Sequence, residues 1–191
     1  MATTVPSGAP SPWVLSVRDL ARGAGVQREL TTRLPAPAAV SMPMLGIPEG
    51  DPVDLELRLE AVHEGVLVTG TAHADLTGEC SRCLLPLHEG ITVDLQELFL
   101  ADPPAEGDDE QPLVEHETVD LEPVFRDAVV TALPFQPLCR PDCEGLCADC
   151  GIRLEDAPAG HAHERVDPRW AALAALADTT EETSITETEK R

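Results

Sequence analysis

The clearest hydrophobic pattern is an alternation of apolar and polar residues in the first half of the chain. In 53–59, Val and Leu alternate with Asp, Glu and Arg, and the same period of two returns in 66–77. This period is typical of half-buried β-strands. Residues 90–100 predict a third strand after the "GECSRCLLP" turn. Because short turns join the three segments, we predict an antiparallel β-sheet, as a meander or partial barrel.

Weaker patterns precede this meander. The segments 13–17 and 26–34 each predict a strand, since both are rich in β-branched and apolar residues. The stretch 35–52 is rich in Pro and Ala, and we expect it to be a linker.

Farther along, the period changes to that of a helix. Apolar residues recur at i, i+3, i+4, i+7, i+8 and i+11, as Leu121, Val124, Phe125, Ala128, Val129 and Ala132. Asp120 can cap this helix and Pro134 ends it. A short C-terminal helix is predicted in "VDPRWAALAALAD", with Asp167 as N-cap and Pro168 at its first position. Strands followed by helices indicate an α+β fold, with the first helix packed on the sheet.

Length and composition set the domain organisation. With 191 residues, 42% of them hydrophobic, the chain can bury one sizeable core. We predict a single α+β domain over 12–177, with an acidic loop at 101–119 and a Cys-rich metal segment at 137–163. The small polar residues of 1–11 and the acidic tail 178–191 are expected to be disordered.

The net charge of −22 restricts the partners that the protein can bind. Residues 101–122 carry nine acids and no Lys or Arg, yet the chain outside this stretch and the tail is acidic too. Proteins that bind RNA on their own usually show a basic face. The charge therefore favours a basic protein partner, although acidity also serves solubility alone.

The sequence also indicates a compartment and a class of function. The N-terminus lacks the basic and apolar regions of a signal peptide, and no apolar run approaches the length of a membrane span. We expect a cytoplasmic protein without membrane contact. No P-loop, GxGxxG, GxSxG or HExxH motif is present, so neither an enzyme nor a small-molecule substrate is predicted. Twelve of the thirteen basic residues are Arg, a bias typical of GC-rich bacterial genomes.

Six cysteines carry the candidate chemistry. They form two CxxC pairs and one CxxxC pair: Cys80 and Cys83, Cys139 and Cys143, Cys147 and Cys150. In the cytoplasm disulfides are rare. A CxxC turn lets two thiolates converge on one ion, and two such pairs complete a tetrahedral zinc site. We therefore predict one or two structural zinc ions.

The grouping of the ligands stays open at this stage. In one arrangement Cys147 and Cys150 join His161 and His163, and a second site consists of Cys80, Cys83, Cys139 and Cys143. In the other, a single zinc ribbon uses Cys80, Cys83, Cys147 and Cys150. The two histidines are then solvated loop residues. A thiol redox role is a further alternative, because CxxC thiols can exchange disulfides or release zinc on oxidation.

Two arginines lie inside the cysteine motifs. Arg82 and Arg140 could contact RNA phosphate or an acidic partner beside the metal. The alternative is an exposed Arg paired with a neighbouring carboxylate such as that of Glu79.

The segments "CSRCLLPL", "DLEPVFRDAVVTALPFQPLCRPDCEGLCADCG" and "DPRWAALAAL" together resemble the YceD family of large ribosomal RNA accumulation proteins. The resemblance runs from about Trp13 to Leu176. It implies a role in synthesis, processing or stability of 23S ribosomal RNA, and genes of the family often neighbour a large-subunit ribosomal protein gene. Relatives often carry Cys-x-Cys where this chain has "HAH". That correspondence implies that His161 and His163 are metal ligands.

From these observations we expect a non-enzymatic ribosome-biogenesis factor that acts through a basic ribosomal protein or assembly factor. Direct contact with 23S ribosomal RNA, through the arginines at 18, 22, 28 and 33, is the second possibility. A zinc-based thiol redox sensor is the alternative from a different class.

Overall fold

The computed structural model describes residues 11–20, 23–103 and 111–163. The chain divides into two compact units, Met1–Gly145 and Leu146–Arg191. The expectations for the N-terminal segment, the short C-terminal helix and the acidic tail fall almost entirely outside the described residues. The extent of the single domain over 12–177 stays a prediction.

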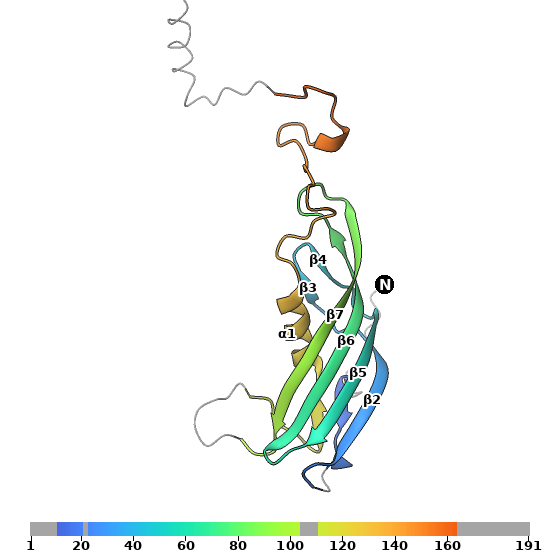
Figure 1. Cartoon of the computed structure of the whole chain (residues 1–191), viewed down its shortest axis with the longest axis vertical. Helices are drawn as coiled ribbons and strands as arrows, with labels where there is room; N and C mark the ends of the chain where they lie inside the picture. The colour runs from blue at the N-terminus through green and yellow to red at the C-terminus, as the bar shows by residue number, and fades with distance from the viewer. Residues whose placement is uncertain (1–10, 21–22, 104–110, 164–191) are drawn as a thin grey trace, which may run out of the picture. The chain divides into compact units, whose positions relative to one another are not determined.

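An antiparallel sheet dominates the first unit, as the alternating pattern predicted (Figure 1). In sheet order its long strands are β2 (Gln27–Pro35), β5 (Pro52–Ala61), β6 (Gly65–Glu79) and β7 (Pro86–Leu100). The register places Leu55 opposite Ala72 and Ala72 opposite Val93. These apolar residues therefore share the buried face of the sheet. The predicted meander of β5, β6 and β7 is confirmed, and β2 extends it beyond β5.

The expectation that 35–52 is only a linker is wrong. This stretch contains the short strands β3 (Val40–Met42) and β4 (Leu45–Ile47). Because β6 runs past the end of β5, part of its edge is free, and β4 pairs there with Leu45 opposite Gly78. A Cβ on Gly78 would lie 2.1 Å from the Met44 oxygen, so only glycine permits this approach.

The acidic loop also contains regular structure where it ends. Strand β8 (Thr118–Asp120) pairs with β1 (Val14–Ser16) in a separate two-stranded sheet. The prediction of an irregular loop over 101–119 therefore fails at its last two residues. Three-residue strands are too short to show a period, and their partner makes them regular.

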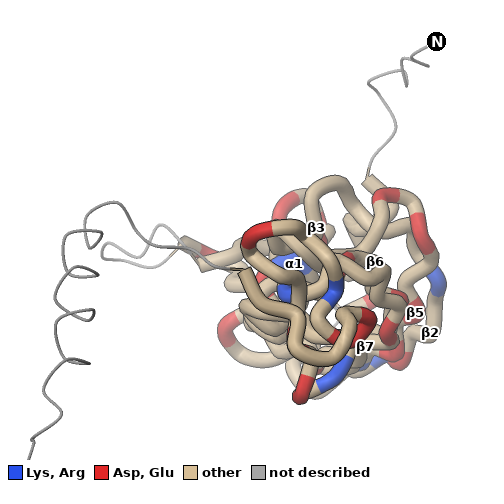
Figure 2. The backbone as a smooth tube through the Cα atoms, turned by 90° about the horizontal axis from the view of Figure 1, so that it is seen from above, with Lys and Arg blue, Asp and Glu red and all other residues tan. Residues whose placement is uncertain are grey.

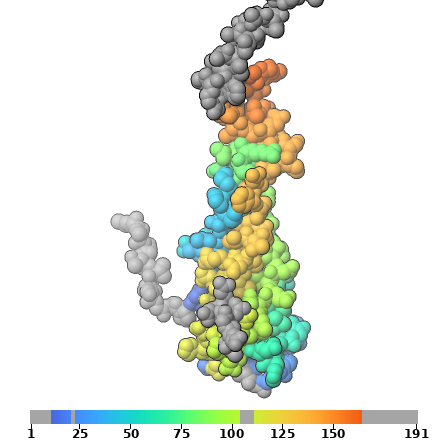
Figure 3. Space-filling view, turned by 90° about the vertical axis from the view of Figure 1, so that its left-hand side faces the viewer, coloured from blue at the N-terminus to red at the C-terminus, as the bar shows by residue number. Residues whose placement is uncertain are grey.

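Helix α1 (Glu122–Ala132) covers the buried face of the sheet beside β7 (Figures 1 and 3). The Asp120 carboxylate accepts a hydrogen bond from the Glu122 N–H at 3.0 Å, so it satisfies one of the free donors of the first turn. Phe125 and Val129 are buried, as the helical period predicted.

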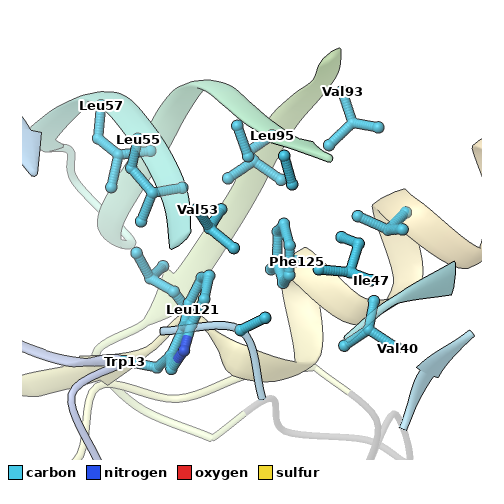
Figure 4. Packing of buried hydrophobic residues seen from close by; sticks show 14 of the residues in the cluster. Trp13, Val40, Ile47, Val53, Leu55, Leu57, Val93, Leu95, Leu121 and Phe125 are labelled. Atoms are coloured by element: carbon cyan, nitrogen blue, oxygen red, sulfur yellow. The ribbon is translucent and has the colours of Figure 1, made fainter. Parts of the chain in front are cut away.

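The core lies between the sheet and α1. Trp13 stacks on Phe125 with ring centroids 4.6 Å apart, and Leu121 packs beside them (Figure 4). Trp13 is 1% exposed, and its indole N–H donates to the Pro35 carbonyl at 2.9 Å. A segment before the sheet is thereby tied to the helix that follows it.

Among the described residues, no helix is long and apolar enough to cross a membrane.

Candidate metal centres

The hairpin between β6 and β7 positions the first cysteine pair. The Cys80 N–H donates to the Leu85 carbonyl at 2.8 Å, and the Leu84 N–H returns to the Cys80 carbonyl at 2.9 Å. Leu84 adopts a positive φ of 58°, which closes this tight turn. The "CSRC" motif therefore lies between two strands, as the sequence predicted, with Cys80 and Cys83 both buried.

The chain after α1 brings the second pair to this hairpin. The Ser81 N–H donates to the Pro137 carbonyl at 2.8 Å, and the Arg82 guanidinium donates to the Cys143 carbonyl at 2.8 Å. Gly145 has a φ of 84°, and a Cβ there would lie 3.1 Å from the Arg82 oxygen. Arg82 and Gly145 thus hold the two segments together. Neither an external contact nor pairing with Glu79, the two roles that the sequence suggested for Arg82, describes this bond to the Cys143 carbonyl.

Cys80, Cys83, Cys139 and Cys143 form what we call the first cluster. Their sulfurs lie within 4.8 Å of one another. Cys80 and Cys143 are separated by 3.8 Å, and Cys83 and Cys139 by 3.6 Å. Four zinc–sulfur bonds of ~2.3 Å in a tetrahedron place two sulfurs ~3.8 Å apart, whereas a disulfide needs ~2.0 Å. The geometry fits a metal ion, and all four thiols are free.

The surroundings of the first cluster favour the thiolate of Cys80 and oppose those of Cys139 and Cys143. Burial would raise the pKa of the Cys80 thiol, but N–H groups of Cys139, Cys83 and Arg82 aim at its sulfur and lower the pKa to about 6. Burial and the neighbouring thiol of Cys83 raise the pKa of Cys139 to about 12 and also raise that of Cys143. A bound dication would compensate this crowding of negative charge.

The second unit contains another knuckle. The Cys147 N–H donates to the Ile152 carbonyl at 2.7 Å, and the Gly151 N–H donates to the Cys147 carbonyl at 2.9 Å. Gly151, directly after Cys150, has a φ of 73°, a left-handed conformation that glycine adopts without steric cost. Leu146 and Arg153 close the knuckle with an antiparallel bridge.

The histidines complete the second cluster, which consists of Cys147, Cys150, His161 and His163. The Nε2 atoms of His161 and His163 lie 3.5 and 3.3 Å from the Cys150 sulfur and 3.1 Å from each other. Tetrahedral zinc with these ligands requires ~3.5 Å between nitrogen and sulfur and ~3.3 Å between nitrogens. Backbone N–H groups of Cys150 and Asp149, together with His161, lower the pKa of Cys147 to about 6.

The structure thus gathers the eight side chains into two groups of four, the first arrangement that the sequence allowed. The donor sets differ: four sulfurs in the first cluster, and two sulfurs and two nitrogens in the second. Either set suits a metal ion, and both match common structural zinc sites. Binding by these residues stays a prediction.

Comparison with known proteins then places the chain in a family. The family described as "Large ribosomal RNA subunit accumulation protein YceD" matches residues 68–177, which include both clusters. The chain belongs to the YceD family. The resemblance noted in the sequence is confirmed. The YceD description names ribosomal RNA accumulation and no catalytic activity.

Relatives of this YceD protein carry no more specific description. An uncharacterized protein of Mycobacterium tuberculosis is 46% identical over 167 residues, 85% of this chain and 80% of the relative. One of Mycobacterium leprae is 41% identical over 85% of this chain and 76% of the relative. The uncharacterized YlbN of Bacillus subtilis is 26% identical over 65% of this chain and 74% of its own. No solved structure matches the chain significantly.

Proposed function

We propose that this YceD protein is a non-enzymatic cytoplasmic factor that supports the accumulation of 23S ribosomal RNA through a basic protein partner. Membership of the YceD family supports the ribosomal role. The charge of the chain supports the partner class, because −22 is unfavourable for binding phosphate and favourable for binding Lys and Arg.

The two clusters have the character of structural zinc sites in this proposal. Each offers four protein ligands, and a tetrahedral ion so bound keeps no open position for substrate. In the first cluster the ion would join the β6–β7 hairpin to the chain after α1. In the second it would hold a loop that has little regular structure beyond the short turn Leu154–Asp156.

The choice of a protein partner over RNA rests on the arginines, because those that the structure describes are already bonded within the chain. Among the described residues, seven arginines pair with carboxylates: Arg18, Arg28, Arg33, Arg58, Arg126, Arg140 and Arg153. The remaining one, Arg82, donates to a backbone carbonyl. In the RNA hypothesis Arg18, Arg28 and Arg33 would exchange Glu117, Asp19 and Asp54 for phosphate, and the fourth arginine of that hypothesis, Arg22, lies outside the described residues. Figure 2 shows acidic positions spread over the strands.

The test compares both partners directly. Cells depleted of the protein should show a lower ratio of 23S to 16S ribosomal RNA, restored by the wild-type chain. The purified zinc-loaded protein should retain basic large-subunit proteins and not naked 23S fragments at physiological salt. Salt-dependent retention of the RNA, with no protein captured, would instead favour direct binding. An unchanged RNA ratio in depleted cells would refute the ribosomal role.

One feature favours a second candidate function. Cys150 is exposed in the second cluster, so an oxidant can reach a metal-bound sulfur there. A zinc-based redox sensor predicts zinc release at micromolar peroxide together with a change in partner binding. Zinc retention under those conditions would exclude this alternative.

A further inference from the structure

Strand β7 is an edge of the main sheet among the described residues. It pairs with β6 along its whole length, from Pro86 opposite Glu79 to Leu100 opposite Gly65. On its outer side, only its last residue makes backbone hydrogen bonds to another described segment. The Leu100 N–H donates to the Pro112 carbonyl at 2.9 Å, and the Leu100 carbonyl accepts from the Val114 N–H at 2.8 Å.

This contact fixes which backbone groups of β7 face outward. Successive residues of a strand direct their N–H and C=O to opposite sides, so every second residue counted back from Leu100 faces away from β6. The outward residues are Leu98, Gln96, Asp94, Thr92 and Gly90. The Leu98 N–H is bonded to the Glu97 carboxylate at 3.1 Å. The backbone groups of the other four are bonded to no described residue, and all four are exposed.

A groove of about 670 Å³ runs along this edge, between residues 92–97 of β7 and helix α1. Figure 3 faces these two elements. The half-buried side chains of Val124 and Ala128 give the wall of α1 an apolar strip. Four carboxylates line the groove, and no Lys or Arg does: they are Asp94, Glu97, Asp120 and Asp127.

The opposite edge of the sheet differs. Proteins usually block an exposed edge with charged side chains, Lys above all, with proline or with a covering segment. On β2, Arg28 reaches the Ser16 carbonyl at 2.9 Å, Arg33 pairs with Asp54, and the strand ends at Pro35. Between Pro86 and Leu100, β7 carries no basic Lys or Arg and has no proline after its first residue. Of the two long edge strands in the described part of the chain, β2 and β7, only β7 carries no Lys or Arg, and its charged residues are Glu89, Asp94 and Glu97.

We propose that the outer edge of β7 and its groove bind an extended basic segment of a partner protein by β-strand addition. The unpaired N–H and C=O groups from Gly90 to Gln96 would supply main-chain hydrogen bonds, and the carboxylates would select Lys and Arg. Alternate side chains of the added strand face α1 near Asp127, and the others lie near Asp94. The inference rests on the proposed function, since it specifies how a basic partner is recognised.

A synthetic peptide tests the backbone part of this proposal. The probe is fluorescein-labelled RVRVRVRVR, blocked at both ends and titrated with the zinc-loaded full chain by fluorescence anisotropy. Two versions are N-methylated, at every Val or at every internal Arg, so that each loses the N–H donors of one edge and keeps its charge. Strand addition requires one version to bind about tenfold more weakly and the other to bind like the parent. Equal affinities of all three peptides would overturn the proposal.

Hydrogen exchange identifies the edge that is used. The amides of Thr92, Asp94 and Gln96 should exchange about tenfold more slowly when the peptide is bound, because their outward N–H groups gain a partner. The amides of Val93 and Leu95 face β6 and should not change. Slower exchange elsewhere with no change at these three residues would overturn the site.

Charge variants test the groove, with a matched control of equal charge change. Asp94→Arg combined with Asp127→Arg should weaken the probe about tenfold. Glu49→Arg combined with Glu56→Arg, at exposed positions outside the groove, should weaken it less than about threefold. All four positions are exposed, so both proteins should fold. If both double variants weaken peptide binding equally, the peptide is attracted only by the overall negative charge, and the proposed binding groove is refuted.

The same variants separate this inference from the proposed function. Suppose that the peptide binds as expected but the Asp94→Arg/Asp127→Arg variant fully restores the RNA ratio in depleted cells. Strand addition then stands, and the proposal that the protein supports RNA accumulation through a basic protein partner is refuted. If the probe does not bind while wild-type protein restores the ratio and captures a basic protein, the proposed function stands and this site is refuted.

Discussion

Replacing Cys143 by alanine removes one of the thiols that connect the β6–β7 hairpin to the chain after α1. The sulfurs of Cys80 and Cys143 are 63 residues apart in sequence and 3.8 Å apart in space. A cross-link that closes a loop of this length removes ~4 kcal/mol of chain entropy from the unfolded state. Because Cys139 remains as a third ligand, we expect Cys143→Ala to lower the free energy of unfolding of the first unit by up to about this amount when zinc is present, with the full loss where three thiols no longer hold the ion.

Urea denaturation followed by the fluorescence of Trp13 measures this loss. Trp13 is buried in the core of the first unit, so its emission reports the unfolding of that unit. The sequence holds one other tryptophan, and a Trp170→Phe background leaves Trp13 as the single probe. The matched control is Cys150→Ala, which removes a thiol from the second cluster. It should leave the Trp13 transition within about 0.5 kcal/mol of the parent.

Chelation provides the decisive comparison. With zinc removed, the parent and the Cys143→Ala variant should unfold at nearly the same urea concentration, because both then lack the cross-link. A difference of several kcal/mol that persists in the chelator would show that Cys143 acts through packing and not through a metal. Equal losses for Cys143→Ala and Cys150→Ala would contradict the division into two separate clusters.

Three further predictions use the core, the helix start and the thiols. Trp13→Ala should cost about 3–5 kcal/mol in urea denaturation followed by circular dichroism, because it removes the ring stacked on Phe125, and Trp13→Phe should cost less. Asp120→Ala should lower the free energy of unfolding by about 1 kcal/mol, because it removes the acceptor for the Glu122 N–H. Asp120→Asn keeps an acceptor and should lose only a small part of this stability. The zinc affinity of the first cluster, measured against a chromophoric chelator, should fall more steeply with acidity below about pH 6. There the Cys80 thiolate, whose pKa is about 6, takes up a proton that zinc must displace; an unchanged slope would contradict this.

The long elements were predictable because each has a period that its environment imposes. Strands β5 and β6 are exposed to solvent on one face only, so apolar and polar residues alternate along them. Helix α1 shows the spacing of apolar residues that one buried helical face requires. Strand β4 has all three residues buried and so has no alternation to detect. Its place depends on β6 continuing past β5 to Gly78, a property of the sheet and not of the segment itself.

The candidate metal ligands were predictable by type but not by grouping. CxxC spacing is a local property, so it identifies the two knuckles from sequence. Which pairs meet depends on contacts across 56 residues between Cys83 and Cys139, and only the sheet topology determines these. Arg82 and Gly145 hold the β6–β7 hairpin and the chain after α1 together. No local signal in the sequence indicates this role beyond their position next to cysteines.

The spread of the first cluster along the chain has a consequence for the order of events during translation. The hairpin thiols emerge from the ribosome 56 residues before Cys139, an interval of ~3–11 s at usual elongation rates. In the second cluster Cys150 and His163 are 13 residues apart and follow each other within ~1–3 s. The first cluster ends at Cys143 and the last residue of the second is His163, so both are completed within one short interval. Metal uptake by the two clusters would wait for this interval, and a nascent chain that stalls before Cys139 carries hairpin thiols without the pair that completes the first cluster.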